Sequence, residues 1–210
     1  AAVLGGAGLI VTTSGASAAC VKGATGYTCS GKITETQTLS GDPLSVIISE
    51  GTTVNVGDQS AFGLTSGTGI TFTNNDPEVT IKGGWDGISA KNYGTGALSI
   101  TTTGKATGNG TNGDGIFAYN KGTDLTINAA ATTGGGYGIK ARNYGTGALS
   151  ITTTGNATGT KYHGIYAKNG NRENPAGTDL TINAATTTGT DGNGIRARNS
   201  GTGALSITTT

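Results

Sequence analysis

Short runs of alternating apolar and polar residues recur along the chain, and glycine-rich stretches separate them. LSVII, TVNV, LSITTT and LTIN are examples, with β-branched residues at many positions. Alternation with a period of two is typical of strands that bury one face, and these runs lack the 3.6-residue period of an amphipathic helix. The pattern therefore predicts an all-β protein.

Two linked motifs recur five times each. The motif G-I-x-A-x-N begins at Gly87, Gly115, Gly138, Gly164 and Gly194. An LSIT or LTIN motif follows each copy, and its leucines are Leu98, Leu125, Leu149, Leu180 and Leu205, spaced 27, 24, 31 and 25 residues apart. A unit of this length cannot bury its own apolar side chains, whereas stacked coils pair each strand in parallel with its equivalents. We predict a right-handed parallel β-helix, or β-solenoid, with coils of 24–31 residues.

Alternation along each strand also assigns the inward positions. In the first strand these are the isoleucines Ile88, Ile116, Ile139, Ile165 and Ile195 and the alanines Ala90, Ala118, Ala141, Ala167 and Ala197. In the second strand they are the five leucines with Ile100, Ile127, Ile151, Ile182 and Ile207. A third inward column is polar and consists of Asn92, Asn120, Asn143, Asn169 and Asn199. Stacked amides can bond to one another and to turn carbonyls, which predicts a structural Asn ladder; a polar ligand column is the alternative.

The outward positions of the first strand are rich in basic and aromatic residues. The candidate binding stripe comprises Lys91, Phe117, Tyr119, Lys140, Arg142, Tyr166, Lys168, Arg196 and Arg198. Cations stacked about 5 Å apart repel each other, and interleaved rings relieve this through cation–π contact. We hypothesise that the stripe binds an acidic or carbohydrate surface such as a host glycan; a solvated face without a partner is the alternative.

The outward positions of the second strand form hydroxyl-rich rows. They are Ser99, Thr126, Ser150, Thr181 and Ser206, and Thr101, Asn128, Thr152, Asn183 and Thr208. Regular threonine arrays also occur in ice-binding solenoids, so ice binding is a further hypothesis. Asparagine in every second coil and unequal coil lengths argue against a surface that matches an ice lattice.

Composition and charge narrow the function classes. The 210 residues include 40 Gly and 3 Pro, with 5% aromatic and 12% charged residues, unlike an ordinary globular core. The net charge of +1 argues against a protein built to bind nucleic acid, which requires clustered cationic charge. Any basic function must therefore be local.

The sequence of the N-terminal region predicts a division of the chain into three parts. Residues 1–19 combine a short apolar stretch with an A-x-A site at Ala16–Ala18, as at the end of a secretory signal; a buried strand is the alternative. Cys20 and Cys29, the two cysteines of the chain, are predicted to form a disulfide in an oxidising compartment. We assign 1–19 to a signal remnant, 20–82 to a cap with irregular coils and 83–210 to regular repeats, with residues 171–177 bulging outward.

Catalytic chemistry is not expected. Polysaccharide-cleaving enzymes also use β-helices, and their chemistry needs two carboxylates in one groove. The acids near the repeats fall at turns or strand starts that the repeat explains, namely Asp86, Asp114, Asp124, Asp179 and Asp191. The single histidine, His163, has no G-x-S-x-G serine and no set of metal ligands near it. We expect no enzymatic activity, metal or cofactor, with a polysaccharide-active enzyme as the alternative.

Three features together resemble a known family. A signal tail, the pattern C-(x)8-C-S-G at Cys20, Cys29, Ser30 and Gly31, and Gly/Thr-rich repeats with GIxAxN and GALSITT phrases resemble the passenger region of Gram-negative autotransporters. The resemblance implies secretion through the periplasm, display on the bacterial surface and adhesion. The partners that it implies are a host-cell or matrix glycan or protein and a C-terminal translocator barrel outside this sequence. Self-association through an open sheet edge is a further hypothesis.

Overall fold

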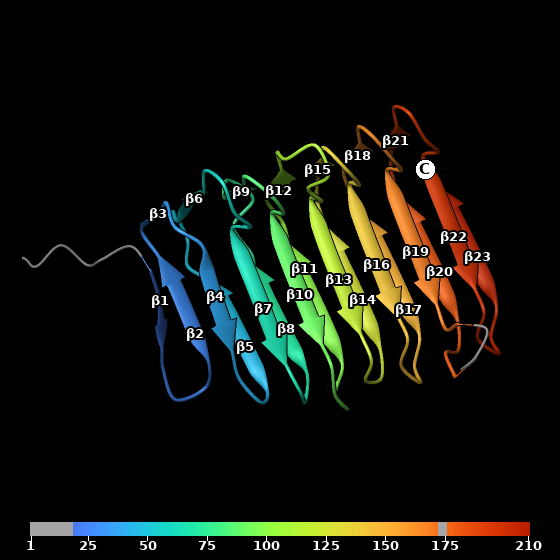
Figure 1. Ribbon diagram of the computed structural model, residues 1–210, viewed down its shortest axis with the longest axis horizontal. Helices are drawn as coiled ribbons and strands as arrows, with labels where there is room; N and C mark the ends of the chain where they lie inside the picture. The colour runs from blue at the N-terminus through green and yellow to red at the C-terminus, as the bar shows by residue number, and fades with distance from the viewer. Residues whose placement is uncertain (1–18, 172–175) are drawn as a thin grey trace, which may run out of the picture.

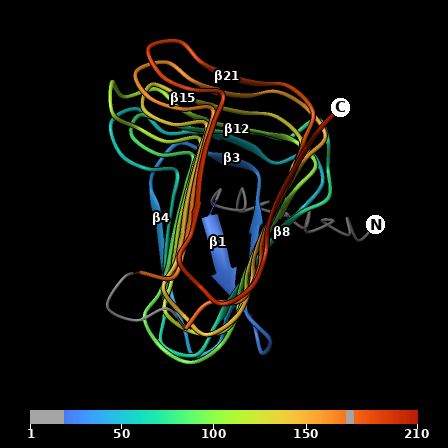
Figure 2. The same ribbon diagram turned by 90° about the vertical axis from the view of Figure 1, so that its right-hand side faces the viewer.

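The computed structural model describes residues 19–171 and 176–210, and every regular element among them is a strand. The strands stack along one long axis from the N-terminal to the C-terminal end of the chain (Figure 1). Seen along that axis, the coils enclose a three-sided outline (Figure 2). The predicted all-β parallel β-helix is confirmed. The proposed signal remnant falls almost wholly on residues 1–18, and most of the predicted bulge on 172–175, both outside the described residues.

Each side of the tube is one sheet. The 9-stranded sheet A carries the leucine strands and comprises β1 (Ala19–Lys22), β2 (Tyr27–Ser30), β5 (Leu44–Ile48), β8 (Ile70–Asn74), β11 (Leu98–Thr102), β14 (Leu125–Ala129), β17 (Leu149–Thr153), β20 (Leu180–Ala184) and β23 (Leu205–Thr209). The 7-stranded sheet C carries the G-I-x-A-x-N strands and comprises β4 (Gln37–Ser40), β7 (Phe62–Ser66), β10 (Ile88–Asn92), β13 (Ile116–Asn120), β16 (Ile139–Asn143), β19 (Ile165–Asn169) and β22 (Ile195–Asn199).

The motif analysis did not assign the third side. The 7-stranded sheet B consists of short strands between the leucine strand and the next G-I-x-A-x-N strand: β3 (Lys32–Ile33), β6 (Thr53–Asn55), β9 (Thr80–Gly83), β12 (Lys105–Gly108), β15 (Thr132–Gly134), β18 (Ala157–Gly159) and β21 (Thr187–Gly189). Threonine and glycine predominate in its later strands, so this side lacks the leucine and isoleucine periodicity that marks the other two.

Equivalent motif positions pair with each other from coil to coil. Ile88 pairs with Ile116, Ile116 with Ile139, and so on along sheet C, and Leu98 pairs with Leu125 in the same way along sheet A. A slip of one residue would turn every inward side chain outward, so the apolar columns hold this register.

The inward columns form one continuous core. The isoleucine, alanine and leucine columns are fully buried from β10 to β20, with exposed fractions of 0–1%. In the irregular coils Phe62 and Phe72 take the places next to Ile88 and Ile100, and their rings meet edge to face at 5.2 Å. In the last described coil Leu205 and Ile207 are 47% and 45% exposed, because β23 is the terminal strand of sheet A.

The glycine that opens each G-I-x-A-x-N motif is required by close approach between coils. A side chain at Gly138 would place its Cβ 2.6 Å from the carbonyl oxygen of Gly164 and 2.8 Å from the amide nitrogen of Thr158. Real Cβ atoms do not approach backbone so closely, which explains why glycine recurs there.

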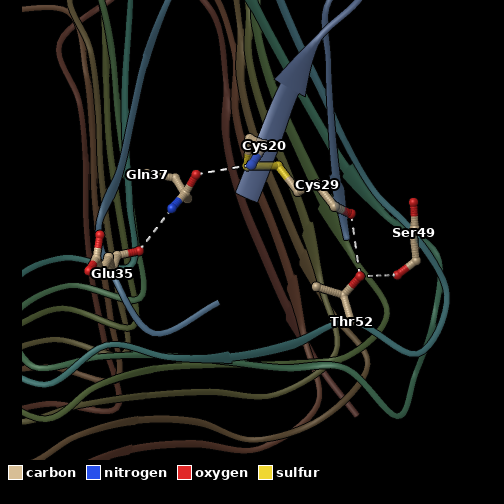
Figure 3. The surroundings of a disulfide bond; sticks show 6 residues. All are labelled: Cys20, Cys29, Glu35, Gln37, Ser49 and Thr52. Atoms are coloured by element: carbon tan, nitrogen blue, oxygen red, sulfur yellow. Dashed lines mark hydrogen bonds between the residues drawn. A yellow bond between two sulfur atoms is a disulfide. The ribbon is translucent and has the colours of Figure 1, made fainter. Parts of the chain in front are cut away.

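A disulfide-linked hairpin closes the N-terminal end of the tube. β1 and β2 pair antiparallel with Cys20 opposite Cys29, and these two residues are joined by a disulfide (Figure 3). The amide of Cys20 donates to Gln37 Oε1 at 3.0 Å, and Cys29 is fully buried in the core. β1 lies within the outline of the coils in Figure 2, so the hairpin covers the first apolar layer. None of the described residues forms a helix of the length and apolar character needed to span a membrane.

Candidate functional site

The stripe residues stand in two adjacent columns on the outer face of sheet C. One column runs Ser89, Phe117, Lys140, Tyr166 and Arg196, and the other runs Lys91, Tyr119, Arg142, Lys168 and Arg198. Both arginines of the last coil are exposed, whereas the other members are half-buried against one another. The structure therefore brings together all nine residues that the sequence placed in the stripe.

Cations and rings alternate in the first column, whereas the second column ends in three successive cations, Arg142, Lys168 and Arg198. Lys91 and Lys140 lie over the ring of Phe117, with Nζ 5.7 and 5.6 Å from its centroid. The guanidinium of Arg142 lies 5.7 Å from the ring centroid of Tyr166. Each ring presents its negative face to a cation, which offsets the repulsion between neighbouring positive charges.

A tyrosine ladder borders the stripe at the C-terminal ends of the sheet C strands. Tyr93, Tyr119 and Tyr144 succeed one another at centroid distances of 5.7 and 5.6 Å. The ammonium of Lys168 lies 4.9 Å from the ring of Tyr144. Sequence reasoning missed Tyr93 and Tyr144, although both directly follow the asparagine of their motif. That position belongs to the turn after the strand, where strand alternation does not predict a direction.

Most of the positive charge on this face has no acidic neighbour. In the described part of the chain, one ion pair lies within 4.0 Å, between Lys140 Nζ and Asp114 Oδ2 at 3.9 Å. The Nε atom of Arg142 is buried without a hydrogen-bond partner among these residues. Apart from Lys140, the cations of the stripe therefore have no carboxylate within 4.0 Å among the described residues.

An open groove borders the stripe at the N-terminal ends of the sheet C strands, where the chain turns from sheet B into sheet C. Its volume is about 500 Å³, and it is lined by Trp85, Asp86, Ser89, Lys91, Asn112, Asp114, Phe117, Tyr137, Lys140, Lys161 and Tyr162. Sequence reasoning missed Trp85, Asn112, Tyr137, Lys161 and Tyr162. A usable signal was present for three of them, because Trp85, Tyr137 and Tyr162 lie one or two residues before the glycine of a repeated Gly-Ile pair.

The groove brings two carboxyl groups together at its buried side. Asp86 and Asp114 are 7% and 3% exposed and occupy the same position in consecutive coils. Asp86 Oδ1 accepts from the amide of Asp114 at 2.8 Å, and Asp114 Oδ1 accepts from the amide of Tyr137 at 3.0 Å. Each carboxylate thus ties its turn to the next coil, which is the turn role expected of them. The sequence did not indicate that they would share a groove with aromatic rings and Lys140.

Burial controls the protonation of both carboxyls. Desolvation raises the pKa of Asp86, and it raises the pKa of Asp114 to about 6 against the opposing effects of the Tyr137 amide and Lys140.

Burial lowers the pKa of His163, with Arg196 adding to the effect, and its Nδ1 accepts from the amide of Asn193 at 3.0 Å. His163 thus holds a turn, and no group of three acidic, histidine or cysteine residues able to hold a metal occurs within 19–171 and 176–210.

The Asn column forms a continuous ladder inside the tube. Each Nδ2 donates to the Oδ1 of the next asparagine, at 2.8 Å from Asn92, 2.9 Å from Asn120, 3.0 Å from Asn143 and 3.3 Å from Asn169. The same amides bond to turn carbonyls, and the first four residues are 0% exposed. The amide groups of these side chains are thus hydrogen-bonded within the fold, which fits the structural interpretation and not a ligand column.

The remaining candidates lie on other parts of the surface. The hydroxyl rows of sheet A are in register, and the asparagines at 128 and 183 interrupt the second row as the sequence indicated. Asp124 and Asp179 each accept from the backbone amide of the next leucine motif, at Ala148 and Ala204, and so hold turns. Neither carboxyl lines the groove.

Comparison of the chain with protein-family models, curated proteins and solved structures found no match in any of the three.

Proposed function

We propose that this chain is the β-helical stalk of a surface-displayed passenger of the autotransporter type, and that it makes extracellular contact by binding acidic glycans along the stripe. The resemblance in the cysteine pair and the repeat phrases supports the secretion class. The parallel β-helix supports it further, because a rigid rod carries one face over a long distance.

The observation that carries the proposal is the row of stacked cations on sheet C, in which Lys140 alone has a carboxylate partner within 4.0 Å among the described residues. Equivalent side chains repeat at about the 4.8 Å spacing of paired strands. A polysaccharide with regularly placed sulfate or carboxylate groups presents many anions along one line. Such a ligand supplies the missing counter-charge, and its sugar rings can lie on the aromatic members of the stripe.

Charge replacement on the stripe tests the proposal. We expect the triple variant Lys168→Gln, Arg196→Gln and Arg198→Gln to bind immobilised heparin about tenfold more weakly or worse, since each removed contact is worth a few tenths to 1 kcal/mol. Binding of the unchanged chain should also weaken steeply as salt is raised, because exposed charge pairs are screened.

A matched control carries the same change of net charge on another face. Lys32, Lys82 and Lys105 lie in sheet B, in β3, β9 and β12. Their replacement by glutamine should leave heparin binding within about twofold. Equal losses in the two triple variants would attribute the binding to net charge alone. Absence of binding to any sulfated or uronate polymer, or to cells, would refute the proposed function.

A further inference from the structure

The groove at the N-terminal ends of the sheet C strands has the size of a site for a single residue of a polymeric ligand. Its volume of about 500 Å³ lies within the range of small-molecule pockets. It is continuous with the stripe, because Lys91, Phe117 and Lys140 line the groove and also belong to the stripe. A polymer lying along the stripe would reach the groove with one of its residues.

Flat rings line this groove, and one of them is exposed. The side chain of Trp85 is 48% exposed, although indole rings are normally buried when no ligand needs them. Trp85 packs against the glycine turn of the next coil, where a Cβ at Gly110 would lie 3.2 Å from Trp85 Cε3. Tyr137 and Tyr162 stack with centroids 4.8 Å apart and an interplanar angle of 23°. Such negative π faces suit the positive C–H face of a pyranose ring.

The accessible charge in the groove is positive. The carboxyls of Asp86 and Asp114 are buried and accept backbone hydrogen bonds, so neither presents a free anion to solvent. Lys161 is exposed, and its Nζ donates to Asn112 Oδ1 at 2.9 Å. Lys140 Nζ lies 4.9 Å from the ring of Tyr137 and 3.9 Å from Asp114 Oδ2, and Lys91 is the third lysine of the groove. Ammonium groups beside flat rings suit a ligand that joins a sugar ring to an anionic group.

We propose that the groove binds a single acidic sugar residue, a uronate or sulfated pyranose, with its ring against Trp85 and its anionic group at Lys140 and Lys161. The inference rests on the proposed function, because it concerns the same face, and it names the ligand class at one defined position. A short acidic oligosaccharide should therefore bind even where it is too short to span the stripe.

Trp85 is the single tryptophan of the chain, so its fluorescence reports on this groove directly. We would titrate the full chain with a galacturonate tetramer and a heparin tetrasaccharide, exciting at the red edge of indole absorption. Both should change the emission saturably. Cellotetraose, which is neutral, and inorganic sulfate, which has no ring, should each bind about tenfold more weakly or worse.

Two variants locate the site. Lys161→Gln and Tyr162→Ala should each weaken tetrasaccharide binding about tenfold, with far-UV circular dichroism verifying that the β-helix is retained. Lys161 is exposed, so its replacement does not threaten folding. The matched control Lys105→Gln removes an exposed lysine from sheet B and should leave the affinity within about twofold.

The outcomes separate this inference from the proposed function. If heparin polymer binds through the stripe but neither tetrasaccharide changes Trp85 emission, the groove inference fails and the proposed function stands. If polymer and tetrasaccharides both fail to bind, both fail. Equal affinity for cellotetraose, tighter binding of adenosine monophosphate, or tetrasaccharide binding that withstands both variants would also overturn the inference.

Discussion

Removing one asparagine from the middle of the ladder should destabilise the β-helix strongly. Asn143 is 0% exposed, and Asn143→Ala deletes an amide that bonds in two directions along the axis. Its Oδ1 accepts from Asn120 Nδ2 at 2.9 Å and from the amide of Gly145 at 3.3 Å. Its Nδ2 donates to Asn169 Oδ1 at 3.0 Å. Alanine therefore leaves two donors and one acceptor without these partners in the interior.

The magnitude follows from which partners can compensate. Asn143 Nδ2 also donates to the carbonyls of Gly147 and Ala148, but these still accept from the backbone amides of Thr178 and Leu125. Asn120 Nδ2 keeps its bonds to the carbonyls of Thr123 and Asp124, so the cost comes chiefly from the amide of Gly145 and from Asn169 Oδ1, which lose these partners. Each buried polar group that loses its partner costs about 1–3 kcal/mol, so we expect a loss of about 2–6 kcal/mol in the free energy of unfolding.

Asn199→Ala is the matched control. Asn199 holds the same motif position in the last coil, and its bonds to Thr178, Gly203 and Ala204 are exposed to solvent. Water can replace them, so we expect a cost of about 1 kcal/mol or less. Urea unfolding followed by circular dichroism measures both values. A cost below about 1 kcal/mol at Asn143, or equal costs at the two sites, would refute a structural ladder that depends on burial.

Three further predictions concern the coil contacts, the groove carboxyls and the cap. Gly138→Ala should cost several kcal/mol in stability, about 3 or more, because the new Cβ meets the backbone of the next coil, and thermal unfolding would measure this. Asp114→Asn should raise stability at about pH 7.5 by up to about 3 kcal/mol, because the pKa of about 6 in the fold exceeds the unfolded value of 3.8 and stability is lost as pH rises between them. Replacing Cys20 and Cys29 by serine should cost about 2–3 kcal/mol through loop entropy, since the two cysteines are 9 positions apart in the sequence.

Each of these predictions has a control within the chain. Gly57 has open space around it, so Gly57→Ala should be neutral or slightly stabilising; a loss as large as at Gly138 would contradict the close-approach argument. Backbone hydrogen bonds lower the pKa of Asp76, so Asp76→Asn should lower stability at neutral pH, with the difference closing as pH falls; the same sign for both aspartates would contradict the burial argument. The double serine variant should no longer respond to reducing agent.

Much of the fold could be predicted from the sequence because every coil of the stack must bury the same kinds of side chain at the same positions. Burial between identical coils demands the same residue at the same height, so the columns that begin at Ile88, Ala90 and Leu98 are visible as motifs. The register, the Asn ladder and the membership of the stripe follow from those motifs and from strand alternation.

Tertiary structure decided that a groove forms, although the repeated Gly-Ile pair marks the position of its rings in the sequence. Trp85, Tyr137 and Tyr162 lie in turns of different coils, and turn backbones do not obey the period of two that gives a side chain its direction. Stacking brings them beside Asp114 and Lys140 because each coil places its corner above the last. The sequence by itself thus determined the repeated features, which are the tube and its faces. Burial between stacked coils requires the same residue types in each coil, so these features are visible as motifs. The folded chain decided what does not repeat, namely which rings and charges meet at a corner.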